Sequence, residues 1–306
     1  MLPNISILII TYNRPDDTLA LLKNLRKQEE LTSCVGEILL LNNASTTPYD
    51  EVVDFIHKNK DVQINYIDHH ENLGVARGRN YLIEIAKHPF LLVLDDDVVF
   101  AETNAISIVS KLFTKSQYIK NNTAVITLDV FYYATKQRQL SAFPHKNDTE
   151  YVGKEWFLTY TFTGCAHLIK KEVFEKTGLY PEDFFYGMEE YDLSYRMIDN
   201  GYTLAYDNSV KVLHKESPQG RIFANDQLAM MWYNKCVVAW RYLPTKYFYS
   251  TAVMWSLQYL RKTKFDFLGA FKNWRKVVKI PKKVTTQKIS KETLSYLRRV
   301  EARLWY

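Results

Sequence analysis

The stretch that most constrains this chain is residues 90–99, in which an unbroken apolar run leads directly into Asp95, Asp96 and Asp97. An apolar run of this length is typical of a strand buried on both faces of a parallel sheet. The carboxylates are therefore expected where that strand ends, at the edge where open α/β sheets bind ligands. Three adjacent carboxylates repel one another, and Mg²⁺ or Mn²⁺ would offset their charge. On this stretch alone, a solvated turn is an equally good interpretation.

Strand-like and helix-like segments alternate along the first hundred residues. Apolar runs at residues 5–11, 38–41 and 64–67 predict three more strands, and a helical pattern follows each of them. This alternation predicts an α/β fold with a Rossmann-like, mainly parallel sheet flanked by helices. After the aspartates the alternation weakens. There the pattern predicts a helix at 102–115, strands at 124–132 and 162–169, a helix at 190–200, short strands at 203–206 and 210–213, and helices from residue 223 onward.

Cysteine usage and charge limit the classes of protein to which this chain can belong. Cys34, Cys165 and Cys236 show neither paired nor metal-type spacing, which argues against a disulfide framework or a zinc site. The first residues lack the pattern of a secretory signal, so we expect a cytoplasmic protein. Residues 241–306 contain 16 Lys and Arg against 3 Asp and Glu, within a chain of net charge +6. Such a basic tail on an acidic body indicates an anionic partner, either a membrane surface or nucleic acid.

Six short motifs occur in order along the chain. They are Thr11-Tyr12-Asn13-Arg14-Pro15, Asn42-Asn43-Ala44-Ser45-Thr46, Asn72-Leu73-Gly74-Val75-Ala76-Arg77-Gly78-Arg79-Asn80, Leu94-Asp95-Asp96-Asp97, Phe162-Thr163-Gly164-Cys165-Ala166 and Phe184-Phe185-Tyr186-Gly187-Met188-Glu189-Glu190-Tyr191-Asp192-Leu193. Together they resemble family 2 glycosyltransferases with the GT-A fold, of the bacterial polysaccharide or O-antigen type, over residues 4–216. The resemblance implies a catalytic domain at 1–221, with a nucleotide-binding half at 1–100 and an acceptor half at 101–221. A helical basic extension then occupies 222–306.

The resemblance assigns the nucleotide of a sugar donor to the ends of the first two strands. It puts Thr11, Tyr12 and Arg14 against the nucleotide, where Tyr can stack on a base and Arg can donate to phosphate. Asn42 replaces the Asp that usually reads a uracil or thymine edge. Because an amide offers both a donor and an acceptor, UDP or dTDP is still expected rather than GDP. The structural alternative for the first motif is a simple helix-entry turn.

The diphosphate is assigned to a loop-to-helix turn that begins at Asn72 and Gly74. Backbone N–H groups at such a helix start can face an anion, and Arg79 follows nearby. Residues 217–221 form a second candidate, a mobile lid from which Arg221 could reach the leaving diphosphate. A solvated helix face and an ordinary connecting loop are the alternatives for these two segments.

The metal is assigned to the last residue of the triple aspartate and to one histidine. The resemblance implies that Asp97 binds Mn²⁺ or Mg²⁺, while Asp95 contacts the ribose or a metal-bound water. Asp96 belongs to the same donor site, although alternate residues of an extended chain face opposite ways, so its side chain should point elsewhere. His214 follows a short strand where similar enzymes supply a further metal ligand; a structural histidine is the alternative.

A general base is expected in the last motif. The family normally has an acidic pair whose second member removes the proton of the acceptor hydroxyl, which places this role on Glu190. Here Glu replaces the usual Asp, so Glu189 and Asp192 remain alternatives. Carboxylates at a helix N-terminus are also favoured by the helix dipole alone.

The C-terminal extension combines aromatic residues with cations. The apolar stretch at 247–257 is too short and too polar to span a bilayer. Nine Lys and Arg follow between residues 261 and 283, which fits a helix lying on an anionic membrane surface. The alternative is an amphipathic helical cap on the catalytic domain with solvated lysines.

These features predict a metal-dependent, inverting glycosyltransferase. It would move a sugar from a nucleoside-diphosphate sugar to a saccharide or lipid-linked saccharide acceptor during cell-surface polysaccharide synthesis, in the cytoplasm or peripherally on the cytoplasmic face of the inner membrane. A sugar-nucleotide pyrophosphorylase is the first competitor, but it needs a Gly-rich loop after the first strand, and residues 12–15 contain no Gly. A nucleic-acid-binding protein is the second, and it leaves the acidic motifs unexplained; we expect no nucleic-acid partner.

Overall fold

The structure is a computed structural model that describes residues 4–219 and 224–305. Its strands are β1 (Ile5–Thr11), β2 (Val35–Asn43), β3 (Ile64–His69), β4 (Phe90–Asp95), β5 (Val98–Phe100), β6 (Thr123–Tyr132), β7 (Trp156–Thr159), β8 (Ala166–Lys170) and β9 (Thr203–His214). The helices of the first 200 residues are α1 (Pro15–Arg26), α2 (Leu31–Cys34), α3 (Asp50–Lys58), α4 (Gly74–Ile85), α5 (Ala105–Val109), η1 (Leu112–Thr114), α6 (Ser116–Lys120), α7 (Asp148–Tyr151), η2 (Lys171–Val173), α8 (Phe174–Thr177) and α9 (Glu189–Asp199). The C-terminal helices are α10 (Ala224–Tyr242), α11 (Thr245–Lys262), α12 (Phe267–Val277), α13 (Ile280–Lys283) and α14 (Lys291–Arg299).

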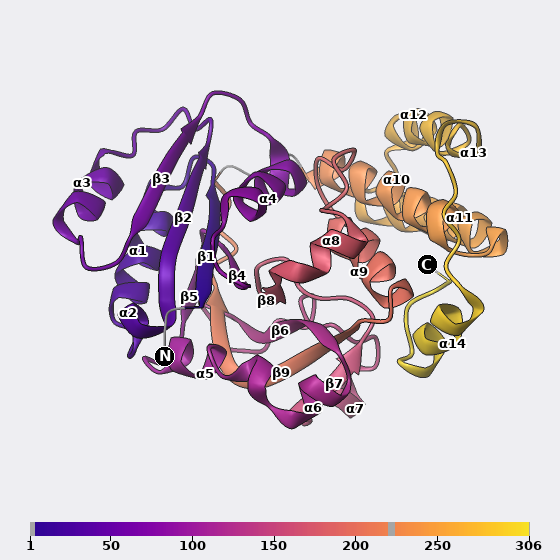
Figure 1. The fold of residues 1–306 in the computed structure, drawn as a ribbon. Helices are drawn as coiled ribbons and strands as arrows, with labels where there is room; N and C mark the ends of the chain where they lie inside the picture. The colour runs from indigo at the N-terminus through magenta and orange to yellow at the C-terminus, as the bar shows by residue number, and fades with distance from the viewer. Residues whose placement is uncertain (1–3, 220–223, 306) are drawn as a thin grey trace.

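One mixed sheet organises the described residues. Its strand order is β3-β2-β1-β4-β8-β6-β9-β5, and β7 pairs with β9 off this path. The strands β3, β2, β1 and β4 are parallel, as the sequence predicts for the nucleotide half. From β4 onward the pairs are antiparallel except for β6 with β9. Figure 1 shows this sheet between the N-terminal helices and the C-terminal helical extension.

Helices cover both faces of the sheet, which explains its unbroken apolar strands. In β1, Ile7 and Ile9 belong to a core that also holds Leu22 of α1, whereas Leu8 belongs to a second core that holds Leu82 of α4. Neighbouring residues of a strand point to opposite faces, so a strand buried on both sides needs an apolar residue at each position. This confirms the α/β class.

The acceptor half differs from its predicted elements in several places. The strand expected at 162–169 is β8, which begins only at Ala166; two residues earlier, the carbonyl of Gly164 accepts from Nη2 of Arg79 at 2.9 Å. The helix expected at 102–115 is divided into α5 and η1, since Leu112 and Phe113 turn into the core. The two short strands at 203–213 are one strand, β9, whose register with β6 shifts at Asp129. The sequence did not predict β5 or β7.

The C-terminal extension packs against the catalytic half through α10. Its Arg241 forms an ion pair with Asp192 of α9 at 2.6 Å, and Asn234 donates to the carbonyls of Tyr186 and Gly187 just before α9. Buried side chains of α10 share one core with those of α9. In the parts of the chain that the structure describes, no helix is both long and apolar enough to cross a membrane. The division of the chain near residue 222 stays a prediction.

Candidate active site

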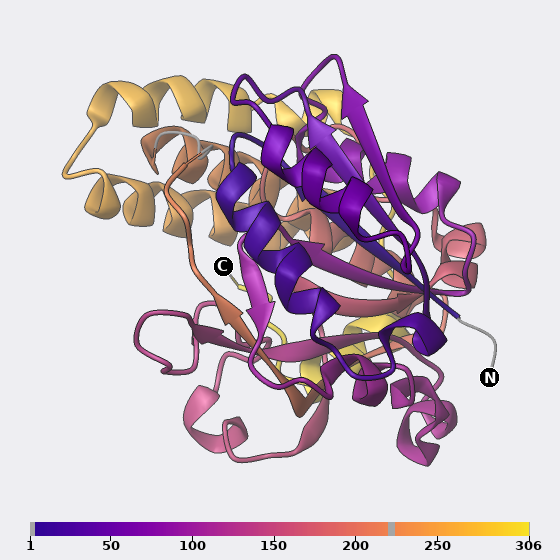
Figure 2. The same ribbon diagram turned by 90° about the vertical axis from the view of Figure 1, so that its left-hand side faces the viewer.

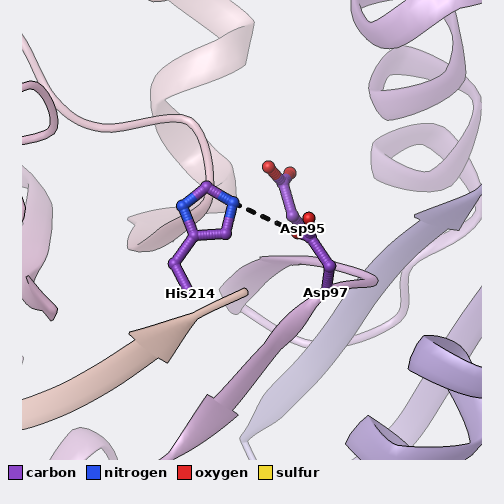
Figure 3. A group of neighbouring side chains, drawn as sticks. All are labelled: Asp95, Asp97 and His214. Atoms are coloured by element: carbon purple, nitrogen blue, oxygen red, sulfur yellow. Dashed lines mark ion pairs between the residues drawn. The ribbon is translucent and has the colours of Figure 1, made fainter. Parts of the chain in front are cut away.

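The short strand β5 brings the triple aspartate to His214. Val98, the first residue of β5, lies opposite His214 at the end of β9 in an antiparallel register. The Nε2 atom of His214 is consequently 3.2 Å from Oδ1 of Asp97 (Figure 3). Candidate ligand atoms of Asp95, Asp97 and His214 all lie within 4.8 Å of one another.

This group has the chemistry of a divalent-metal site. Two carboxylates and an imidazole suit Mn²⁺, and Mg²⁺ is also compatible with the carboxylates. Nδ1 of His214 lies 2.9 Å from Oε1 of Gln139, a contact that fixes the ring orientation and directs Nε2 toward Asp97. With no cation bound, burial opposes the charged imidazolium, but the hydrogen bond to Asp97 outweighs it and raises the pKa of His214 to about 11; a bound cation would displace this proton.

Arg14 links the aspartates to the segment that follows β9. Its Nη1 atom lies 2.8 Å from Oδ1 of Asp96 and 3.3 Å from Oδ2 of Asp97. The same guanidinium donates to the carbonyls of Gln219 and Ser217, at 2.6 Å and 3.2 Å. Burial raises the pKa of Asp96 to about 7 despite the opposing charge of Arg14. Asp96 therefore faces Arg14 and stands outside the metal group, as its place in the extended chain predicts.

A cavity of about 720 Å³ lies beside the aspartates. Its lining includes Tyr12, Arg14, Asn72, Gly74 and Arg79, together with all three aspartates and His214. The α4 turn is shaped by Gly74, whose φ of +72° is strained for a side-chain-bearing residue. The N–H of Gly74 donates to Oδ1 of Asn72 at 2.9 Å. Most residues predicted for the donor thus meet at one cavity.

Two predicted donor residues are instead engaged in side-chain hydrogen bonds. The hydroxyl of Thr11 lies 2.6 Å from that of Tyr49, and the residue is buried. Asn42 donates to the hydroxyl of Tyr66 at 2.9 Å and to Oδ1 of Asp68 at 3.0 Å. Neither residue lines the cavity, so their contact with a nucleotide remains a prediction. Arg221 lies outside the described residues.

Arg79 joins the metal group to the acidic pair of α9. Its Nη1 atom lies 2.8 Å from Oε1 of Glu190 and 3.9 Å from Oε1 of Glu189, and Nη2 lies 3.5 Å from Oδ1 of Asp95. Nη2 also donates to the carbonyl of Gly164 at 2.9 Å. Arg79 is buried on α4, so burial disfavours its charge, but the surrounding carboxylates outweigh that cost and raise its pKa. One guanidinium therefore organises both halves of the site.

The three candidate bases have different environments. Glu190 is partly exposed, whereas Glu189 is buried, and burial together with the charge of Glu190 raises the pKa of Glu189. Asp192 is buried, and its two oxygens accept from Arg196 at 2.9 Å and from Arg241 at 2.6 Å. Asp192 therefore links α9 to α10, and both of its oxygens already accept hydrogen bonds.

Sequence reasoning assigned no role to three residues that shape the site. Asn43 lines the cavity, accepts from the N–H of Leu73 at 2.8 Å and donates to Asn72 at 3.0 Å. Its position beside Asn42 in the second motif could have indicated that Asn43 belongs to the site. Gly164 stood in the fifth motif, but its carbonyl contact with Arg79 is a tertiary feature. Gln139 lies in a polar segment without any motif.

Comparison with known proteins identifies the class. The mannosyltransferase PcManGT from Pyrobaculum calidifontis, in complex with GDP-Man and Mn²⁺, has a TM-score of 0.62 and 14% identity, and the match covers 98% of this chain and 79% of that one. Residues 1–349 of S. aureus TarS, in complex with UDP-GlcNAc, give a TM-score of 0.60 and 13% identity, covering 99% and 89%. These likenesses confirm the predicted GT-A fold.

Sequence comparison then gives the family. The sequence model of glycosyl transferase family 2 matches residues 6–178, and the chain belongs to this family. An uncharacterized protein of Haemophilus influenzae is 30% identical over 187 residues, which are 58% of this chain and 92% of that protein. The resemblance inferred from the six motifs is therefore confirmed, and a sugar-transfer function is supported.

Proposed function

We propose that the protein is an inverting glycosyltransferase that uses a nucleoside-diphosphate sugar and a divalent metal. The observation that carries this proposal is the double contact of Arg79, which lies 3.5 Å from Asp95 of the metal group and 2.8 Å from Glu190. A donor whose diphosphate lies at the metal group would place its sugar toward α9. The acceptor hydroxyl would then approach from the side of Glu190.

The donor is held by residues around the cavity. Asp95, Asp97 and His214 hold the metal, and Mn²⁺ fits this set better than Mg²⁺ because one ligand is an imidazole nitrogen. Such a cation, when bound, neutralises the diphosphate leaving group. Tyr12 stacks on the base, which we take to be that of UDP or dTDP rather than GDP. We assign the phosphates to Arg14 and to the N–H groups of Leu73 and Gly74, which would exchange their present acceptors, Asn43 and Asn72, for phosphate oxygens.

Glu190 is the general base. The acceptor oxygen forms a bond to the anomeric carbon, the bond from that carbon to the diphosphate oxygen breaks, and the acceptor proton moves to the carboxylate. Arg79 contacts Oε1 of Glu190, so we assign the proton to Oε2. Glu189 is a weaker candidate because its raised pKa favours the protonated form, and Asp192 is weaker because both of its oxygens are paired with arginines.

The acceptor is a saccharide or a lipid-linked saccharide in cell-surface polysaccharide synthesis. We place the protein in the cytoplasm, peripherally on the cytoplasmic face of the inner membrane. The support for this placement is the basic tail, with 16 Lys and Arg between residues 241 and 306.

A donor screen tests the proposed reaction. The full chain is incubated with UDP-, dTDP- and GDP-sugars, with Mn²⁺, with Mg²⁺ or with a chelator, and release of nucleoside diphosphate is measured. We expect release from a UDP- or dTDP-sugar that requires the metal. Formation of inorganic pyrophosphate from a nucleoside triphosphate and a sugar phosphate would instead indicate a pyrophosphorylase.

A further inference from the structure

The turn between α11 and α12 exposes large apolar side chains at the end of a projecting helical hairpin. Phe265, Phe267, Leu268 and Phe271, here called the apolar patch, are each between 63% and 76% exposed. Figure 2 shows α11 and α12 lying side by side in orange and yellow at the upper left, with their connecting turn at the outer end. Single exposed apolar residues are common, but four within seven positions mark an interaction surface.

The turn is held in a defined and costly shape. Lys264 and Phe265 both have left-handed φ angles, of +53° and +69°, which are unfavourable for residues with large side chains. The N–H of Phe265 donates to the carbonyl of Leu260 at 2.7 Å, and Asp266 caps α12 by accepting from the N–H of Gly269 at 2.8 Å. The structure therefore presents the patch in a fixed orientation, at a conformational cost that burying Phe265 in a partner would offset.

Helix α12 separates its packed face from two exposed faces. Ala270, Asn273 and Val277 are buried against the rest of the protein. Phe267 and Phe271 of α12, and Val278 directly after its last residue, recur at i, i+4 and i+11 and are all exposed, so they form an apolar face directed away from the body. Lys272, Lys276 and Lys279 are exposed on the adjoining face. An apolar face beside a cationic face is the pattern of a helix that lies in a membrane interface.

The charged side chains around the apolar patch are almost all positive. Between residues 261 and 283 there are nine Lys and Arg and a single acidic residue, Asp266. Asp266 is occupied within the turn, where its two oxygens accept from Gly269 and from the hydroxyl of Tyr259. The surface therefore offers a cationic rim around an apolar centre.

We propose that the α11–α12 hairpin docks on an anionic lipid bilayer, with the apolar patch inserted among the acyl chains and the cations at the headgroups. Contact with a second copy of the chain through the same face is disfavoured, because it would bring two like-charged sets of Lys272, Lys276 and Lys279 together. Anionic headgroups would pair with the cations of the rim, and acyl chains would bury the apolar patch. A bilayer is the partner that supplies both.

Docking also orients the active site. The hairpin packs on α10, and Asn234 of α10 donates to the backbone of Tyr186 and Gly187, immediately before the helix that carries Glu190. A bound membrane surface would thus hold the acceptor side of the site in a fixed relation to a lipid-linked acceptor. Only this orientation of the active site toward an acceptor rests on the proposed function. Vesicle binding can fail while sugar transfer is observed, and sugar transfer can fail while vesicle binding is observed.

The test measures binding of the full chain to sedimented vesicles of phosphatidylcholine alone and of phosphatidylcholine mixed with the anionic lipid phosphatidylglycerol. Phe267→Ser with Leu268→Ser tests the patch, and Lys272→Glu with Lys276→Glu tests the rim. Ile119→Ser is the apolar control, because Ile119 is exposed on α6, far from α12 in Figure 1. Lys58→Glu with Lys60→Glu is the charge control on the catalytic domain.

We expect binding to anionic vesicles that high salt weakens, and a loss of at least about tenfold in partition for each hairpin variant but for neither control. All the substituted side chains are exposed, so circular dichroism should show unchanged folding. Equal binding of the intact protein to neutral and anionic vesicles would overturn the proposal. So would a dimer in sedimentation equilibrium that the patch variant dissociates, or nucleic-acid binding without vesicle binding.

Discussion

Nη1 of Arg79 lies 2.8 Å from Oε1 of Glu190, although 111 positions separate the two residues in the chain. Arg79 belongs to α4, which opens the donor cavity, and Glu190 belongs to the first turn of α9. This ion pair therefore sets the separation between the diphosphate side and the acceptor side.

Replacing Glu190 by Gln should collapse turnover without weakening donor binding. Glutamine keeps the size and polarity of the side chain but cannot accept the acceptor proton, and loss of a positioned base typically costs about 10²–10⁴-fold in rate. The measurements are kcat and, by calorimetry, the Kd of the donor with Mn²⁺ present. A near-normal kcat for this variant would remove Glu190 from the mechanism.

Glu189→Gln and Asp192→Asn serve as comparisons for the base. If either of them shows the collapse in kcat instead, the base is reassigned to that residue. We expect Asp192→Asn to act mainly on stability, by about 3–5 kcal/mol, because it leaves Arg196 and Arg241 facing a neutral group in a buried site. Urea unfolding separates this effect from a loss of catalysis.

Replacing Asp97 by Ala should abolish metal-dependent donor binding. The change removes a buried carboxylate that lies 3.2 Å from His214 in the metal group. Asp96→Asn should be milder, since Asp96 faces Arg14. Mn²⁺ affinity by calorimetry and turnover with and without chelator check both variants. Full turnover of the Asp97 variant in chelator would contradict the metal assignment.

Replacing Gly164 by Ala should lower kcat although the residue carries no reactive group. A Cβ atom at this position would overlap Oε1 of Glu190 and lie 3.0 Å from Nη2 of Arg79, so the carboxylate must shift. Displacement of a catalytic group by about 1 Å can cost up to about 10²-fold in rate. Gly153→Ala is the matched control, because a Cβ there meets no atom within 4 Å. Equal kcat values for the two variants would show that the position of Glu190 is not critical.

Replacing Glu189 by Gln should change how stability depends on pH. Burial and the charge of Glu190 raise the pKa of Glu189 above its usual value of 4.5 in the folded protein. Between 4.5 and that raised pKa, the unfolded chain loses a proton that the folded protein keeps, so the free energy of unfolding falls as pH rises through this window.

Glutamine does not titrate, so the variant should lose this decline. The difference in the free energy of unfolding, variant minus native protein, should therefore rise with pH. Across the whole window the rise is about 1.4 kcal/mol for each unit by which folding raises the pKa of Glu189. Urea unfolding at several pH values from 4 to about 9 provides the curves. Parallel curves for the two proteins would show that Glu189 titrates normally.

The sequence by itself determined the α/β class, the parallel nucleotide half and the family, because these rest on local apolar periodicity and on six motifs in order. It also put Asp97 and His214 in one metal assignment, with Asp95 on the ribose or a metal-bound water, and the structure brings ligand atoms of all three within 4.8 Å of one another. The cationic tail was evident from composition alone.

Only the tertiary structure decided which neighbours each polar side chain meets. The three-residue strand β5 is too short to leave a periodic signal, yet its pairing with β9 sets Asp97 beside His214. The contact of Arg79 with Glu190, the pairing of Asp192 with Arg241 and the exposure of Phe267 likewise depend on segments far apart in the chain. Local propensity carries no information about such contacts, because they form when distant elements pack together.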